Sequence, residues 1–472
     1  MRRIAVMGLF TVMLFADPAL AASPAKLDGA QLGIIWSVPF AGMLLSIALL
    51  PLLTPRFWEH HFGKVAMFWA AAFIIPCVIA FGPRTAAVET LHTMADEYFP
   101  FIILLFSLFV IAGGIQVVGN LVGTPGTNIA ILTFGTLTAS FLGTTGASML
   151  LIRPLIRANQ NRRRNAHVFI FFIFLVSNIG GSLTPLGDPP LFLGFLKGID
   201  FFWTANAMLL PMLLSSVLLL ALFYAIDRRY WRKESTQRTA QSQVPRQVRV
   251  EGLHNVLYLA GIVGAVLISG LWKPGVSIPL GFGIDIPLEG LARDIILLSL
   301  SYLSLKTTRA SIRIENAFTW TPIQEVAILF AGIFITMIPA LAILRAGQSG
   351  AFAPMLALVS APDGQPVEAA YFWLTGTLSS FLDNAPTYLV FFNLAGGDPQ
   401  VLMGPLAKTL LAISAGAVFM GANTYIGNAP NFMVKSICEE RGIKMPSFFG
   451  YMLWSGAILL PLFAIVTWVF FV

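Results

Sequence analysis

Apolar stretches of about 20 residues recur along the whole chain, and short loops that carry Arg and Lys separate most of them. A helix of this length matches the hydrocarbon core of a bilayer, so the pattern predicts a helical protein that crosses the membrane many times. The composition agrees, because 57% of the 472 residues are hydrophobic and only 11% are charged. The expected single spans cover residues 32–53, 65–82, 99–121, 206–226, 254–272, 289–305, 322–344 and 449–472.

Four further segments do not fit a straight span. Residues 128–157 and 368–395 are too long for one crossing and carry polar or turn residues in the middle, which predicts re-entrant hairpins. Residues 167–198 and 405–434 are apolar helices interrupted by Gly, Pro and polar side chains. Unpaired backbone groups cost several kcal/mol each in hydrocarbon, so irregular backbone is tolerated there only where it lines a cavity. We therefore expect both broken helices to face a binding site.

The two broken helices repeat each other at an offset of 240 positions. The first reads Ser-Asn-Ile-Gly-Gly-Ser-Leu-Thr-Pro-Leu-Gly-Asp-Pro-Pro over residues 177–190, and Gly181 falls on Gly421 and Gly187 on Gly427. The same offset places residues 140–146 on 380–386, so the hairpins repeat as well. A simple proline kink would explain one interruption but not a matched pair. Matched interruptions in two halves indicate the binding site of a transporter.

Basic loops set the expected topology, because Arg and Lys favour the cytoplasmic side. Every basic loop falls there only if residues 128–157 and 368–395 are hairpins. Each half then has five spans and one hairpin, and this odd number of crossings inverts the second half. The predicted fold is an all-α polytopic membrane protein: two inverted repeats of five transmembrane helices plus one re-entrant hairpin, with broken helices at the midplane. The repeats are residues 22–230 and 251–472, joined by a cytoplasmic linker at 231–250.

The amino terminus has the pattern of a secretory signal. A basic start, an apolar core over residues 4–15 and Ala19-Leu20-Ala21 predict a signal peptide at residues 1–21, with an uncleaved anchor as the alternative. The expected location is the bacterial inner membrane.

Two carboxylates, Asp188 and Asp383, fall at the centres of the repeats. An ionised carboxylate in a low-dielectric site must be protonated, paired or bound to a cation, so one site can exchange H⁺ for Na⁺ or Li⁺. The alternative is that each carboxylate caps the helix that follows it. Neutral oxygens of the kind that hard cations prefer surround them, from Asn178, Ser182, Thr184, Asn384, Thr387, Asn423, Thr424 and Asn428.

Other chemistry is not indicated. The two cysteines define neither a disulfide framework nor a metal site, and no cofactor is expected. The histidines, His167 among them, are expected in solvated loops or at the ends of spans. The net charge of +7 lies in loops, so it favours membrane topology over nucleic-acid binding. An intramembrane aspartyl protease is disfavoured, because Pro185-Leu186-Gly187 precedes Asp188 where such an enzyme has Gly-x-Gly. No enzymatic activity is predicted.

The segment 177–190, together with Leu-Asp-Asn-Ala-Pro-Thr at 382–387, resembles the NhaD-type sodium/proton antiporters of the ion transporter superfamily, which is related to arsenite and citrate/dicarboxylate permeases. The resemblance implies a secondary transporter that exchanges cytoplasmic Na⁺ or Li⁺ for external H⁺ at Asp188 and Asp383. It also implies a homodimer with scaffold and transport regions, whose partners are the lipid bilayer, small cations and protons.

The sequence departs from these relatives in two places. Its hairpin tips, at 143–146 and 383–386, lack the Ser-Asn-Thr triplets of the dicarboxylate carriers, which disfavours a dianion site. Leu191 stands where the antiporters carry an amide, which leaves the ion preference open. The alternative function is a proton- or sodium-coupled permease for an anion of the oxyanion or citrate/dicarboxylate type.

Overall fold

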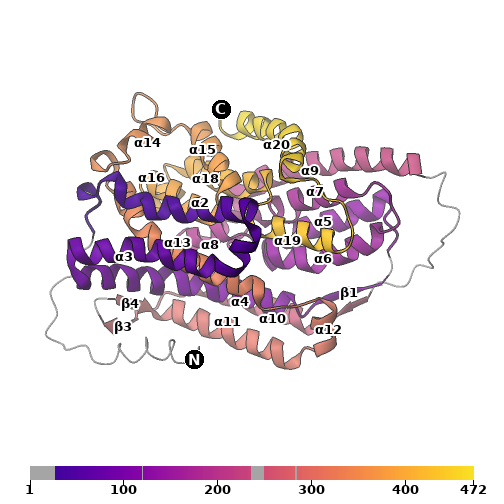
Figure 1. Ribbon diagram of the computed structural model, residues 1–472, viewed down its shortest axis with the longest axis horizontal. Helices are drawn as coiled ribbons and strands as arrows, with labels where there is room; N and C mark the ends of the chain where they lie inside the picture. Colours follow the sequence, from indigo (N-terminus) through magenta and orange to yellow (C-terminus); the bar gives the residue numbers. More distant parts are fainter. Residues whose placement is uncertain (1–26, 120, 235–248, 282–283) are drawn as a thin grey trace.

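The computed structural model describes residues 27–119, 121–234, 249–281 and 284–472, and helices make up most of it (Figure 1). The first half contains α2 (Val38–Leu53), α3 (Pro55–Thr93), α4 (Phe99–Ala112), α5 (Pro125–Leu142), α6 (Thr144–Asn159), α7 (Ala166–Leu175), α8 (Pro189–Leu196) and α9 (Phe201–Glu234). The second contains α10 (His254–Leu271), α11 (Leu288–Thr307), α12 (Ala310–Glu315), α13 (Thr321–Arg345), α14 (Ala353–Leu358), α15 (Glu368–Phe381), α16 (Asn384–Leu394), α17 (Pro399–Met403), α18 (Ala407–Met420), α19 (Ala429–Glu440) and α20 (Phe448–Phe470).

Several of these helices are long and apolar enough to cross a membrane. They are Ile34–Leu53, Pro55–Ala112, Phe201–Glu234, His254–Leu271, Thr321–Arg345 and Phe448–Phe470. The protein is therefore a multi-pass membrane protein, as its sequence predicts. The expected signal peptide lies outside the described residues, as does most of the expected linker; positions 231–234 of that linker belong to α9.

Two expected boundaries are wrong. The expected spans 32–53 and 65–82 imply a loop between them that includes residues 56–64, but this segment is helical, because α3 begins at Pro55 directly after α2 and continues through these charged residues as a largely exposed helical face. The helix α3 is interrupted at Gly82, which has a φ of 83° and directly precedes Pro83. The span expected at 99–121 ends early, at Ala112, where Gly113 and Gly114 stop the helix. The strand β1 (Gln116–Val118) follows and pairs with β2 (Arg249–Glu251) from the start of the second half.

Both segments that were expected to be hairpins are divided where predicted, while their re-entrant course in the membrane stays a prediction. In the first, α5 and α6 pack together around Gly143, whose φ of 73° permits the tight turn between them. In the second, α15 packs against α16 across a short connection at Leu382 and Asp383. Each segment is thus two short helices and not one long span, as predicted.

Both broken helices are also present. The first consists of α7, a 3₁₀ turn at Ile179–Ser182 and α8; the second consists of α18, a 3₁₀ turn at Gly421–Asn423 and α19. α16 packs against α8, and α6 packs against α19, which lies beside it in Figure 1. Each hairpin of one half therefore contacts the broken helix of the other half.

The same hydrogen bonds support both breaks at the offset of 240 positions. Ser140 donates to the carbonyl of Gly180, and Ser380 donates to that of Met420. Thr184 donates to the Ser140 carbonyl, and Thr424 donates to the Ser380 carbonyl. The two halves therefore have the same local structure where their helices break, while their opposite orientation in the membrane stays a prediction.

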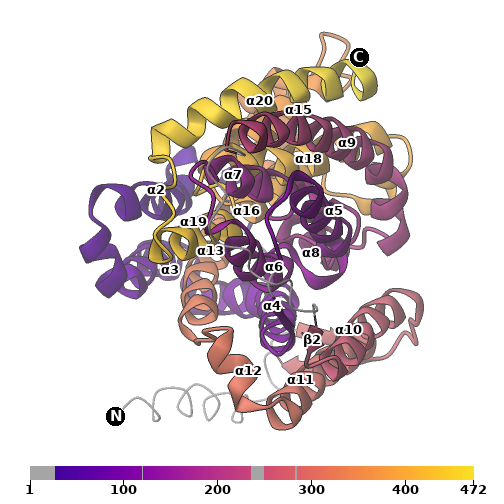
Figure 2. The same cartoon turned by 90° about the vertical axis from the view of Figure 1, so that its right-hand side faces the viewer.

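The remaining helices pack beside these elements. α3 packs against α2 and α13, and α4 packs against α10 and α11. Figure 2 shows α10, α11 and α12 projecting to one side of the hairpins and broken helices. A hairpin of β3 (Ser277–Gly281) and β4 (Ile284–Pro287) connects α10 to α11.

Glycines allow the closest backbone approach at both breaks. A Cβ atom on Gly187 would lie 2.1 Å from the carbonyl oxygen of Gly181, and one on Gly427 would lie 2.6 Å from that of Gly421. Backbone atoms cannot move away as a flexible side chain can, so both positions require glycine.

We expect Gly187→Ala and Gly427→Ala each to destabilise the protein by about 1–3 kcal/mol, because the added methyl overpacks against backbone. Thermal unfolding of the detergent-solubilised protein, followed by size-exclusion chromatography, measures this as a lower melting temperature. Gly264→Ala and Gly456→Ala are matched controls, since a Cβ atom there meets nothing within 4 Å. Equal melting temperatures for the two pairs of variants would contradict the close approach.

Candidate functional site

The centre of the candidate site is the carboxylate of Asp188, which is only 1% exposed. It accepts hydrogen bonds from Asn384 Nδ2 at 2.5 Å, Thr144 Oγ1 at 3.0 Å and Asn428 Nδ2 at 3.1 Å. Asn384 and Thr144 are the first residues of α16 and α6, and Asn428 directly precedes α19, so both halves of the chain contribute. All three are neutral, and in the described part of the chain no basic side chain forms an ion pair or hydrogen bond with Asp188.

The offset of 240 positions relates these residues in pairs. Thr144 corresponds to Asn384, and Asp188 corresponds to Asn428. The carboxylate therefore contacts its own counterpart in the other half, which places the cluster where the two halves meet. One half supplies a carboxylate and the other an amide, so this centre is chemically asymmetric.

Four helices begin at or beside this cluster. α6 begins at Thr144, α16 at Asn384, and α8 and α19 each begin one residue after Asp188 and Asn428. The amino end of a helix carries a partial positive charge, which favours nearby negative charge. The arrangement can therefore stabilise either the ionised Asp188 or a carboxylate of a bound ligand, without a basic side chain.

The two predicted carboxylates have different surroundings. Asp188 precedes α8, but its side chain forms no capping bond with that helix. Asp383 does cap its helix, because its carboxylate accepts the backbone N–H of Ala385 at 3.2 Å. It is half-buried, and the structure shows no hydrogen bond between it and Asp188 among the described residues. The capping alternative thus accounts for Asp383 but not for Asp188.

A second layer of amides supports the central cluster. Asn428 also donates to Asn178 Oδ1 at 3.2 Å, and Asn178 donates to Asn431 Oδ1 at 2.7 Å. Asn431 in turn donates to the carbonyls of Gly421 and Thr424, both at 2.9 Å. These bonds satisfy backbone groups that the helix break frees, and they connect the first break to the second.

Asn431 and Thr144 are site residues that the sequence pattern did not predict. The offset of 240 positions could have indicated both residues, because Asn431 corresponds to position 191, where the antiporters carry an amide, and Thr144 corresponds to the candidate Asn384. The amide that is absent at position 191 is thus present in the other half. Ser148 and Ser177, which bond each other at 2.8 Å, also belong to this buried polar region.

Other predicted site residues bond nearby backbone. Ser182 donates to the carbonyl of Ile179, and Thr387 donates to that of Asp383. Thr184 and Thr424 donate to the carbonyls of Ser140 and Ser380, as described above. The structure therefore brings Asp188, Asn384, Asn428 and Asn178 together, and gives these hydroxyls a role in the breaks.

Two acceptor oxygens near the breaks have no partner in the described part of the chain. They are Oδ1 of Asn384, whose Nδ2 bonds Asp188, and Oδ1 of Asn423, whose Nδ2 bonds Ser380. A buried acceptor left unpaired costs free energy, so each suits a bound cation or water. Amide and carboxylate oxygens are the ligands that a small hard cation prefers, and of these two only Asn384 belongs to a side chain that contacts Asp188 in the described residues.

A second buried carboxylate lies away from this centre. Asp227 on α9 is fully buried and contacts Arg162 at 2.6 Å, His167 at 2.8 Å and Asn128 at 3.0 Å. The expectation that His167 is solvated is therefore wrong, because the end of α9 covers the start of α7 and buries that ring.

We expect Asn431→Leu, which copies Leu191 into the second half, to destabilise the protein strongly. The carbonyls of Gly421 and Thr424 and the amide of Asn178 would lose a partner, at about 1–3 kcal/mol for each group left unpaired. The melting temperature in detergent measures this. Ser182→Ala is the control, because that hydroxyl donates only to the carbonyl of Ile179 within its own turn. If both variants melt alike, the amide layer does not support the breaks.

Comparison with known proteins identifies the family. A family model described as "Putative citrate transport" matches residues 29–471. A search of curated proteins found no match. The match covers both hairpins, both broken helices and the Asp188 cluster, and it fits the expected superfamily of ion transporters and citrate permeases. The chain belongs to this citrate transport family.

Proposed function

We propose that this protein is a secondary transporter that couples the movement of citrate, or a similar carboxylate, to H⁺ or Na⁺ across the bacterial inner membrane. Asp188 is the group at which the coupling cation binds. One observation carries this proposal: a buried carboxylate contacts both halves of the chain, and all of its hydrogen-bond donors are neutral.

The cation part of the proposal follows from the cost of burying charge. An ionised carboxylate without a basic partner is expensive in a low-dielectric site, so a proton or a Na⁺ ion lowers its free energy. The free Oδ1 atom of Asn384 supports this part, because it belongs to a side chain that already contacts Asp188. H⁺ and Na⁺ would compete for the same oxygens, and that competition couples their movements.

The anion part rests on the family and on the helix ends. The family description names citrate, and four helices begin at the cluster around Asp188. Their partial positive charge favours a substrate carboxylate, and a cation bound at Asp188 would remove the repulsion between that substrate and the site. Binding of the cation would thus favour binding of the anion, as coupled transport in one direction requires.

Exchange of Na⁺ or Li⁺ for H⁺ without a carried anion is the second candidate. It is favoured by the absence of any Lys or Arg bonded to the Asp188 cluster in the described residues, because a citrate ion with several carboxylates would gain from such a partner. The same carboxylate would serve both activities, so only transport measurements separate them.

We expect Asp188→Asn to fold but to lose cation-coupled transport. Asn384 can turn its unpaired Oδ1 toward the new amide, so the cluster keeps hydrogen bonds while it loses the titrating group. Proteoliposomes measure this, with uptake of labelled citrate under an imposed Na⁺ or H⁺ gradient. A trapped pH dye reports exchange of Na⁺ or Li⁺ for H⁺ in the absence of citrate.

The control is Asp285→Asn, which makes the same change of charge at an exposed position. Citrate uptake driven by a cation supports the coupled permease, while a dye response without citrate supports the antiporter. The exchanged variant Asp188→Asn/Asn428→Asp returns a carboxylate to the same cluster and should transport better than Asp188→Asn alone. Full coupled transport by Asp188→Asn would remove Asp188 from the mechanism.

We expect Asp383→Asn to keep its stability and to lose transport only if Asp383 binds the ion. Asn is as good a cap as Asp, so the bond to the N–H of Ala385 should persist. The free energy of unfolding should change by less than about 0.5 kcal/mol, which leaves the melting temperature nearly unchanged. If ion binding at Asp383 is required, uptake should fall by tenfold or more (about 1.4 kcal/mol). Unchanged uptake would assign Asp383 to capping alone.

A further inference from the structure

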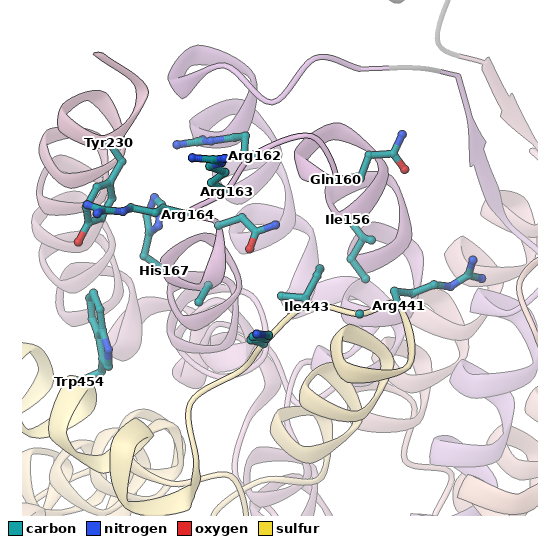
Figure 3. A pocket seen from close by; sticks show the side chains of 14 residues that line it. Ile156, Gln160, Arg162, Arg163, Arg164, His167, Tyr230, Arg441, Ile443 and Trp454 are labelled. Atoms are coloured by element: carbon teal, nitrogen blue, oxygen red, sulfur yellow. The ribbon is translucent and has the colours of Figure 1, made fainter. Parts of the chain in front are cut away.

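A basic pocket of about 560 Å³ lies apart from the Asp188 cluster. Figure 3 shows its walls, which come from the connection between α6 and α7, the end of α9, the connection between α19 and α20, and α20 itself. The lining residues are Ile156, Gln160, Arg162, Arg163, Arg164, Asn165, Ala166, His167, Tyr230, Arg441, Gly442, Ile443, Lys444 and Trp454. We call it the basic pocket.

The residues that line this pocket carry positive charge only, and Glu234 beside it accepts the backbone N–H of Arg164 at 3.0 Å and lies 3.5 Å from the guanidinium of Arg162. Arg162, Arg163, Arg164, Arg441 and Lys444 line it, and none of the described lining residues is acidic. Arg162 has partners, since its guanidinium contacts Asp227. Arg163, Arg441 and Lys444 are exposed, however, and form no ion pair with any described residue. Like charges held together repel each other, so an anion between them lowers the free energy of the pocket.

The floor of the pocket is a built structure. Arg162 is 7% exposed; besides Asp227, it contacts the carbonyl of Gly123 at 3.3 Å, and its guanidinium lies 5.5 Å from the ring centre of Trp231. His167 is held by the same Asp227 carboxylate. These buried contacts fix the backbone from which Arg163 and Arg164 project, so the basic groups are positioned and are not a random surface cluster.

The pocket borders apolar surface on two membrane-spanning helices. Tyr230 is at the end of α9 and Trp454 is near the start of α20, and these two helices pack against each other. The same helices expose large apolar side chains, among them Leu222 on α9 and Phe449 and Leu453 on α20, the last two 76% and 77% exposed. Basic residues and amphipathic aromatic rings beside lipid-facing helices are typical of the headgroup region of a membrane.

We propose that the basic pocket binds a phosphate-bearing anion, namely the headgroup of an anionic phospholipid whose chains lie against α9 and α20. Free inorganic phosphate offers the same chemistry to the arginines. The apolar faces beside the pocket favour the lipid, because they cover its chains while Arg163, Arg441 and Lys444 bind its phosphate. This proposal does not depend on what the protein transports.

Such a ligand would join two segments that lie far apart in the sequence. α6 ends at Asn159, directly before one side of the pocket, and α19 ends at Glu440, directly before the other. These two helices pack together and carry Thr144 and, just before α19, Asn428 at their opposite ends. The anion would thus stabilise the packing of α6 against α19 from the end remote from Asp188.

The test compares the full-length protein with Arg163→Gln/Arg441→Gln/Lys444→Gln. Native mass spectrometry in detergent measures binding of phosphatidylglycerol, with zwitterionic phosphatidylcholine as the lipid control. The melting temperature is measured with each lipid and with inorganic phosphate. The matched variant is Lys64→Gln/Arg229→Gln/Arg309→Gln, which removes the same charge from exposed positions outside the pocket.

We expect phosphatidylglycerol to bind the wild type and the matched variant and to raise the melting temperature of both. Its affinity for the pocket variant should be lower by a factor of about ten or more. If inorganic phosphate stabilises the wild type, phosphatidylglycerol does not, and the pocket variant loses the effect, the pocket is an anion site whose ligand is free phosphate and not a lipid headgroup. Equal binding of phosphatidylglycerol to both variants, or equal binding of both lipids to the wild type, would overturn the proposal.

Discussion

A buried carboxylate with only neutral donors around it is the constraint on which this structure depends. Asp188 is held by hydroxyl and amide groups from both halves of the chain, with no basic partner among its described contacts. Such a group is low in free energy only when a proton, a cation or the positive ends of helices balance it. The hairpins and broken helices are arranged so that four helix starts meet at this one point.

The breaks that create those helix starts also require many hydrogen bonds. Each interruption frees carbonyl groups that the bilayer cannot satisfy, so polar side chains must replace the helical partners. Ser140 and Thr184 do this at the first break, and Ser380 and Thr424 do it at the second. This explains why several polar residues in the motifs support the backbone, while only some of them contact Asp188.

The two halves share one local structure but differ in chemistry. Asp188 in the first half corresponds to Asn428 in the second, and Leu191 corresponds to Asn431. A carboxylate in one half and a network of amides in the other suit a centre that binds one cation, since two facing carboxylates would repel each other. Membership of the citrate transport family agrees with a transport role for this centre, and the substrate is the point that the proposed experiments address.

The sequence by itself determined the class of the protein and the places where its helices break. Apolar length and the positions of Gly and Pro are local properties, so they predicted a multi-pass membrane protein and the four segments whose helices are interrupted, before any contact was known. Local patterns failed at the segment 56–64, where charged residues continue a helix, and at His167, where the packing of α9 over α7 buries the ring. Tertiary structure alone decided which polar residues meet. Asp188 and Asn428 are 240 positions apart, and only the crossing of the two halves brings the carboxylate of one against the amide of the other.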